Sequence, residues 1–171
     1  IINPNFIFYT PQHSEAGWTR LSECSKILKS KTYSYGEIKN KNRIVKVRDL
    51  SKDASKLILD DSYQNEFTLN KYLKVNQSAL LVAKVGNKLK PTVFDFEEEP
   101  IYIHQNVIAL AADNRKTSIN FLAQAVFDAE KNGYYASFYR GATIPYLTQA
   151  DVLHKIKIDL PSIDTQKAQL E

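Results

Sequence analysis

The sequence contains no methionine, one cysteine and only five glycines. The lone Cys24 can form no disulfide within the chain, and every Cys-x-x-Cys metal or redox motif is excluded. The glycines stand at positions 17, 36, 86, 133 and 141, too scattered for a glycine-rich loop that holds phosphates. Because no internal disulfide is possible and the first residues lack the pattern of a secretion signal, we expect a cytoplasmic protein.

The sequence also lacks an initiating methionine and any apolar run near the roughly eighteen residues of a membrane helix. We therefore expect a piece of a longer protein, with no membrane among its partners. Its 43% hydrophobic and 25% charged residues exclude a disordered chain, and 171 residues fit one domain with a sizeable core.

Candidate catalytic and metal-binding groups are few and scattered. His13, His104 and His154 have no second metal ligand at a suitable spacing, and no serine elbow occurs. The three acids at 97–99 cannot all face one site and suit a solvated turn. The tetrapeptide Asn3-Pro4-Asn5-Phe6 is one residue away from the base-gripping motif of adenine amino-methyltransferases, but no cofactor loop accompanies it. We expect no catalytic residue, no metal site and no cofactor on this chain.

Hydrophobic periodicity predicts strands mixed with short helices. Helical spacing covers 18–28 and 118–130, the second helix ending at Asn132-Gly133 with these residues inward: Ile119, Leu122, Ala123, Val126 and Phe127. Strands are predicted over 44–50, 72–75, 79–85, 92–96, 101–103 and 107–111, with a turn at Gly86-Asn87. These elements indicate an α+β fold, a curved and mostly antiparallel β-sheet domain with short helices on one side.

Positive charge is concentrated near the start of the chain. The first fifty residues carry nine lysines and arginines against four acids. They surround the Tyr33-Ser-Tyr-Gly36 turn, a composition that suits contact with phosphates through the charges and with sugars or bases through the rings. We predict DNA phosphate contacts among Lys39, Lys41, Arg43, Lys46 and Arg48. A solvated basic loop would have the same composition.

Two later stretches are further candidates for DNA contact. Lys84, Lys88 and Lys90 crowd the predicted turn, which either projects into a DNA groove or keeps a hairpin soluble. Tyr139 and Arg140 close a group of aromatic residues. We expect most of these rings in the core, whereas one beside Arg140 could reach nucleic acid.

The C-terminal stretch combines three elements. Thr148, with Asp151 three residues on, predicts a capped helix over 149–154. Alternation over 155–160 predicts a strand that buries Ile156, Ile158 and Leu160 and stops at Pro161. A helix capped by Ser162 or Asp164 then covers 165–171. About two turns are marginal in isolation, so we expect this helix to continue in the parent protein.

The order Gly141-Ala142-Thr143, short helix, Ile-x-Ile strand, Leu160-Pro161 and Gln166 resembles the specificity subunit of type I restriction-modification enzymes. Gly17-Trp18 and the stretches 43–50, 78–86 and 105–110 resemble further parts of that family, so the resemblance covers about residues 17 to 171. One departure is Gln77-Ser78, where many relatives have Gly-Asp before the central strand.

The resemblance implies an extended lead-in over 1–16, a target recognition domain over 17–161 and the start of a spacer helix over 162–171. Such a domain would read one half of a bipartite double-stranded DNA target. It would direct a methyltransferase (modification) subunit, specific for adenine N6, and a restriction/translocase subunit, which would hold S-adenosylmethionine and ATP. The spacer would set the distance between two half-sites. Two alternatives stay open: a protein-docking module of the same complex without base contacts, and a fragment of an adenine methyltransferase.

Overall fold

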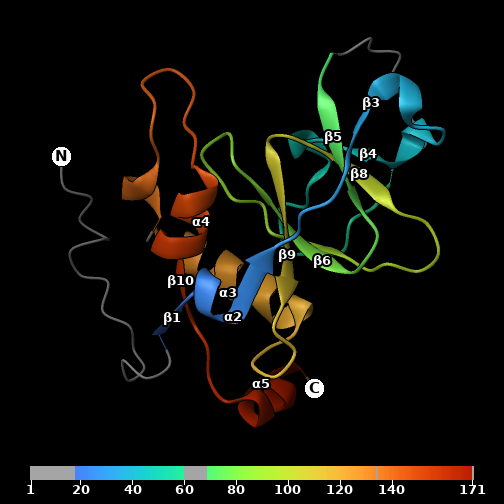
Figure 1. Ribbon diagram of the computed structural model, residues 1–171. Helices are drawn as coiled ribbons and strands as arrows, with labels where there is room; N and C mark the ends of the chain where they lie inside the picture. Colours follow the sequence, from blue (N-terminus) through green and yellow to red (C-terminus); the bar gives the residue numbers. More distant parts are fainter. Residues whose placement is uncertain (1–17, 60–68, 134, 171) are drawn as a thin grey trace.

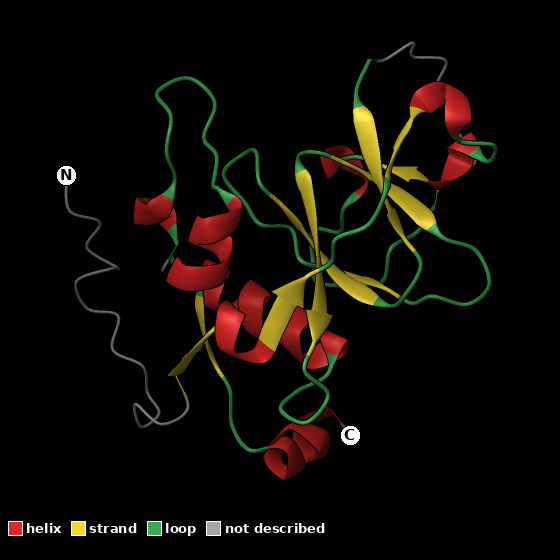
Figure 2. Ribbon diagram, viewed as in Figure 1, coloured by secondary structure: helices red, strands yellow, loops and turns green. Residues whose placement is uncertain are grey.

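The computed structural model describes residues 18–59, 69–133 and 135–170 (Figure 1). The predicted lead-in and the tetrapeptide at 3–6 lie outside these ranges. Three small sheets and several short helices make up the described part of the chain (Figure 2). All strand pairs but one are antiparallel, so the predicted α+β class is confirmed.

A four-stranded antiparallel sheet, here the central sheet, forms the middle of the domain. In spatial order its strands are β2 (Ser25–Ile27), β9 (Val107–Ala112), β6 (Ala79–Ala83) and β7 (Thr92–Phe94). Every residue of β6 is buried. Leu80 enters one hydrophobic cluster and Leu81 the opposite one. Because successive side chains of a strand point to opposite faces, the central sheet is covered on both sides.

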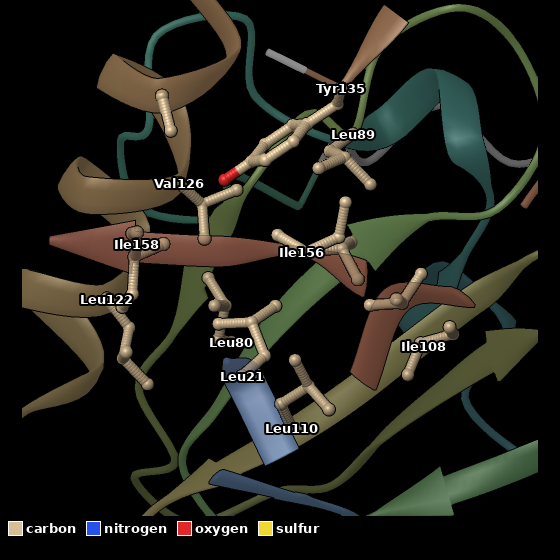
Figure 3. Close-up of a cluster of buried hydrophobic side chains, with 14 of the residues drawn as sticks. Leu21, Leu80, Leu89, Ile108, Leu110, Leu122, Val126, Tyr135, Ile156 and Ile158 are labelled. Carbon is tan, nitrogen blue, oxygen red and sulfur yellow. The ribbon is translucent and has the colours of Figure 1, made fainter. Parts of the chain in front are cut away.

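The first cluster lies between the central sheet and the helices α2 (Leu21–Cys24), α3 (Ile119–Lys131) and α4 (Gln149–Lys155). Figure 3 shows Leu80 and Leu110 of the sheet in one cluster with Leu122 of α3 and with Ile158. Ser118 caps the start of α3, because its hydroxyl accepts a hydrogen bond from the Phe121 amide at 3.1 Å. Asn132 caps its end, and Gly133 follows with φ +72°. The helix predicted over 118–130 is therefore confirmed.

The second cluster joins the central sheet to an outer sheet of four strands. In spatial order these are β3 (Thr32–Ser34), β5 (Lys71–Val75), β8 (Ile101–His104) and β4 (Ile44–Val45), of which β4 runs parallel to β8. Val75, Ile101 and Ile103 pack with Leu81 and Ala109 of the central sheet. Three 3-10 turns follow the early strands: η2 (Tyr35–Glu37), η3 (Lys41–Arg43) and η4 (Val47–Asp49).

The C-terminal elements follow the predicted order. The Thr148 hydroxyl accepts from the Asp151 amide, and the Asp151 carboxylate accepts from the Thr148 amide, both at 3.0 Å, so α4 begins with a complete capping box. Strand β10 (Lys157–Asp159) pairs with β1 (Trp18–Arg20), and helix α5 (Ile163–Leu170) comes last. The buried Gln166 amide donates to the carbonyls of Lys116 and Pro161 at 2.7 and 2.8 Å, which attaches α5 to the domain.

Two predicted elements are wrong. The helix expected over 18–28 is instead β1, the four-residue α2 and β2, because the flanking residues pair with β10 and β9. Leu21 and Cys24 are nevertheless buried. The strand expected over 44–50 ends after Val45, since the Asp49 carboxylate accepts from the Lys46 amide at 2.8 Å and closes η4. Local capping therefore replaces the ladder at this point.

The connection between β6 and β7 is longer than the turn predicted at Gly86-Asn87. A longer loop occupies 84–91, with Gly86 at φ +102° and Lys90 at φ +50°. Among the described residues, no helix is long and apolar enough to cross a membrane.

Candidate nucleic-acid interface

The face of the outer sheet opposite the second cluster carries rings and ammonium groups. Tyr33 pairs with Tyr72 across β3 and β5, and Lys74 pairs with Tyr102 across β5 and β8. Residues paired in this way share a face. The rings of Tyr33 and Tyr102 meet edge to face, with centroids 5.5 Å apart. The ammonium groups of Lys31 and Lys74 lie 5.3 and 5.9 Å from the Tyr33 centroid. We call Lys31, Tyr33, Lys74 and Tyr102 the tyrosine–lysine cluster.

The basic residues predicted from the first fifty differ in availability. Lys39 is exposed, and the Lys41 ammonium lies 4.3 Å from the centroid of the Tyr35 ring. Arg48 keeps half of its side chain exposed beside Asp49, at 3.8 Å. Arg43 donates through Nε to the Pro100 carbonyl at 2.7 Å and through Nη2 to the Glu99 carbonyl at 2.8 Å. Arg43 therefore already holds the 99–100 turn against η3.

The lysines of the 84–90 loop meet the early basic segment. The Lys90 ammonium donates to the Val47 carbonyl at 2.8 Å, which ties the loop to η4. Burial, and the nearby charge of Lys52, lower the pKa of Lys90. Lys88 remains exposed, because the neighbouring Leu89 is the buried residue and its amide donates to the Glu130 carboxylate at 2.6 Å. Two stretches predicted separately thus form one continuous region.

His104 marks the same junction at the end of β8. Its Nδ1 accepts from the Asn106 amide at 3.2 Å, and its Nε2 lies 3.1 Å from the side-chain nitrogen of Asn70. Burial lowers the pKa of His104, and the charges of Lys46 and Lys84 lower it further. Two lysines from distant parts of the chain therefore act on the pKa of the same imidazole.

Tyr139 and Arg140 lie in different environments. The Tyr139 hydroxyl is buried without a hydrogen-bond partner in the described part of the chain, and this burial raises its pKa. The Arg140 guanidinium donates through Nε and Nη2 to the two carboxylate oxygens of Asp151, at 2.8 and 3.0 Å. Half of the Arg140 side chain is exposed, whereas that of Asp151 is only 3% exposed. These bonds lower the pKa of Asp151.

Arg140 also begins a short hairpin over 140–146, which we call the 140–146 hairpin. The backbone groups of Arg140 and Tyr146 exchange two hydrogen bonds, at 2.9 and 3.0 Å. The hairpin lies beside the 84–90 loop, because the Gly86 amide donates to the Pro145 carbonyl at 2.9 Å and the Leu147 amide to the Lys84 carbonyl at 2.8 Å. Figure 1 shows it projecting from the domain near α4, in orange.

Three residues of this surface carry no recognisable signal in the sequence. Lys74 and Tyr102 join Tyr33 only through the register of β5 and β8, which one sequence does not reveal. Ile144 stands in a stretch without periodicity, where Gly141 and Pro145 give the only signal of a turn. Within 18–59, 69–133 and 135–170, no group of three or more His, Cys, Asp or Glu residues could hold a metal ion. The lysines and tyrosines of this surface suit contact with an anionic polymer.

Comparison with known proteins concerns the fold as a whole. No protein-family model matches the sequence, and no curated protein matches it. Solved structures do match, and together they define the fold as that of a domain from the S subunit of type I restriction-modification systems.

The matching structures can be named individually. The HsdS subunit from Thermoanaerobacter tengcongensis has a TM-score of 0.61 at 13% identity, over 94% of this chain and 37% of that chain. A structure of a type I restriction-modification system in assembly gives 0.57 at 15% identity, over 96% of this chain and 39% of that one. The S subunit from M. genitalium gives 0.53 at 13%, over 93% and 38%.

TM-scores above 0.5 establish a shared fold, and at identities of 13–15% they establish the fold alone. The chain spans well under half the length of the subunits it matches. At the level of the fold, the resemblance read from the sequence is confirmed.

Proposed function

We propose that this chain is a non-catalytic, sequence-specific recognition domain for double-stranded DNA in a restriction-modification system. The observation that carries the proposal is the bond between Lys90 and the Val47 carbonyl, which unites the 84–90 loop with the early basic segment. The tyrosine–lysine cluster on the outer sheet and the 140–146 hairpin beside the 84–90 loop add rings, further positive charge and a projecting loop. Charges of this kind suit phosphates, and loops on a rigid sheet suit base edges.

The likeness to S subunits supports the assignment of partners. The domain would read one half of a bipartite target and bring a methyltransferase subunit and a restriction/translocase subunit to it. Those subunits would hold S-adenosylmethionine and ATP, and this chain would need no cofactor. Reading of the target and recruitment of the two subunits would both take place in the cytoplasm, where the DNA is found. The division at residues 17–161 and 162–171 remains a prediction.

The test is DNA selection followed by measurement of salt dependence. The full 171-residue chain would be used to enrich binding sequences from a random duplex library, and the affinity for the best duplex would be measured at several salt concentrations. The variant Lys39→Gln/Arg48→Gln removes two exposed charges of the predicted phosphate-contacting set. We expect weaker binding to every duplex and a salt slope smaller by about 0.9 for each phosphate that is no longer neutralised.

A matched control removes the same charges elsewhere. Arg115→Gln/Lys167→Gln also replaces one exposed arginine and one exposed lysine, in the β9–α3 loop and in α5, at the end of the molecule away from the outer sheet (Figure 1). This variant should keep the wild-type slope. Equal slopes for both double variants would reject the assigned surface. Binding to a methyltransferase subunit without DNA affinity would favour the docking module, and binding of S-adenosylmethionine would favour a methyltransferase fragment.

A further inference from the structure

The tip of the 140–146 hairpin exposes an aliphatic side chain to solvent. Ile144 is 63% exposed and Tyr146 is 42% exposed, so two large apolar residues lie in one short loop. Single exposed apolar residues are common and need no explanation. What distinguishes this pair is how firmly the loop beneath it is held.

Several independent interactions fix the hairpin. Arg140 and Tyr146 pair through two backbone bonds, and the Gly86 amide holds the Pro145 carbonyl from the neighbouring loop. The Arg140 guanidinium is bonded to the buried Asp151 carboxylate. Gly141 has φ +89°, and a Cβ there would lie 2.5 Å from the Ile144 carbonyl, so only glycine fits. A loop ordered before binding loses little conformational entropy when it binds.

The charges around the hairpin indicate the kind of partner. The two adjoining stretches, 84–90 and 140–155, contain five lysines and arginines and a single carboxylate, that of Asp151. That carboxylate is buried against Arg140, so the exposed charge is positive. An apolar protein surface would gain nothing from this charge, whereas DNA phosphates would. The major groove of DNA is wide enough for a two-stranded ribbon, and thymine presents a methyl group there.

We propose that Ile144 reads a thymine: the 140–146 hairpin enters the major groove and places this side chain against a thymine 5-methyl group. The inference rests on the proposed DNA recognition and assigns one of its base contacts. Lys84 and Lys88 would neutralise flanking phosphates, which orient the hairpin without reading the sequence.

The experiment removes the methyl group from the DNA and, separately, shortens the Ile144 side chain of the protein. In the duplex selected by the full chain, each thymine is replaced in turn by uracil, which lacks only the methyl group. At one position we expect the affinity of the wild-type protein to fall about fourfold, because the complex no longer buries that methyl group. Ile144→Ala should bind thymine and uracil duplexes equally at that position. Gly141→Ala keeps Ile144 but displaces the hairpin, and should also lose the difference while keeping a wild-type circular dichroism spectrum.

A control on another element is Ile163→Ala, which shortens a partly buried isoleucine on α5 and should retain the full fourfold difference. If Ile144→Ala retains the same sensitivity as the wild type at every thymine, or if no thymine is sensitive to loss of its methyl group, the assignment of Ile144 is wrong while DNA recognition stands. If the chain binds no duplex at all, the proposed function fails and this inference fails with it.

Discussion

Replacing Asp151 with asparagine removes one negative charge from a nearly isosteric side chain at the base of the 140–146 hairpin. In the wild type its carboxylate receives two hydrogen bonds from the Arg140 guanidinium, at 2.8 and 3.0 Å, and a third contact from the Lys155 ammonium at 3.1 Å. Hydrogen bonds to a charged group contribute about 1.5–3 kcal/mol. Both cations are about half exposed, so screening by solvent places the effect at the lower end. We expect the free energy of unfolding to fall by about 2 kcal/mol.

A second variant separates charge from capping. Asp151→Ala also removes the acceptor for the Thr148 amide, and loss of such a cap costs about 1 kcal/mol more. For a domain of this size each kcal/mol corresponds to about 2–4 °C, so Asp151→Asn should lower Tm by about 4–8 °C. Urea denaturation at neutral pH measures both variants. Asp113→Asn, which breaks an exposed pair with Arg115, should have little effect and serves as the control.

The pH dependence gives a sharper test of the same reasoning. The Arg140 guanidinium is the main cause that lowers the pKa of Asp151 in the folded protein, below the value of about 3.9 expected when unfolded. The unfolded state therefore binds the proton first on acidification. This stabilisation is complete above about pH 4 and is lost as the pH falls towards the folded pKa. The stability difference between wild type and Asp151→Asn should shrink from pH 6 to pH 2. A constant difference would refute the ion-pair account.

Two further predictions concern the attachment of α5 and the central sheet. Gln166→Glu would place a carboxylate against the carbonyls of Lys116 and Pro161, so at pH 7 the α5 amides of the variant should exchange faster than those of the wild type. Near pH 4 the protonated acid can donate a hydrogen bond, and the two proteins should exchange at more similar rates. A ratio of variant to wild-type exchange rates that is the same at both pH values would contradict this. Leu80→Ala and Leu81→Ala should each lower the free energy of unfolding by about 3 kcal/mol in urea titrations, because both leucines are fully buried; a loss below about 1 kcal/mol for either would show that its face of the sheet is not closely packed.

Elements whose limits depend on neighbouring residues could be predicted from the sequence. Helix α4 begins where Thr148 and Asp151 form a capping box, and α3 ends at Asn132 and Gly133. Those signals act within a few residues of the chain, so a single sequence contains them. The apolar run at 79–85 likewise predicts a strand, and β6 forms within it.

Elements whose form depends on distant partners could not be predicted in the same way. The apolar spacing of 18–28 fits a helix, but pairing of β1 with β10 and of β2 with β9 leaves only α2 helical. The candidate surface has the same dependence. The lysines of 84–90 were visible in the sequence, whereas their junction with η4 rests on the Lys90 contact with Val47, more than forty residues away. Tertiary pairing overrides local preference in both cases.

The central sheet affects how the two candidate contact regions open and close. The tyrosine–lysine cluster lies on the outer sheet, which packs on one face of the central sheet, and the 140–146 hairpin is bonded to α4, which packs on the other. Alternate residues of β6 point into the two hydrophobic clusters on either side of the central sheet. Neither hydrophobic cluster can open without exposing side chains of this shared strand. We therefore expect the two hydrophobic clusters to open together, so that the β6 amides between them exchange with one common free energy. The distance between the two candidate contact regions is therefore set by one layer of backbone, the central sheet.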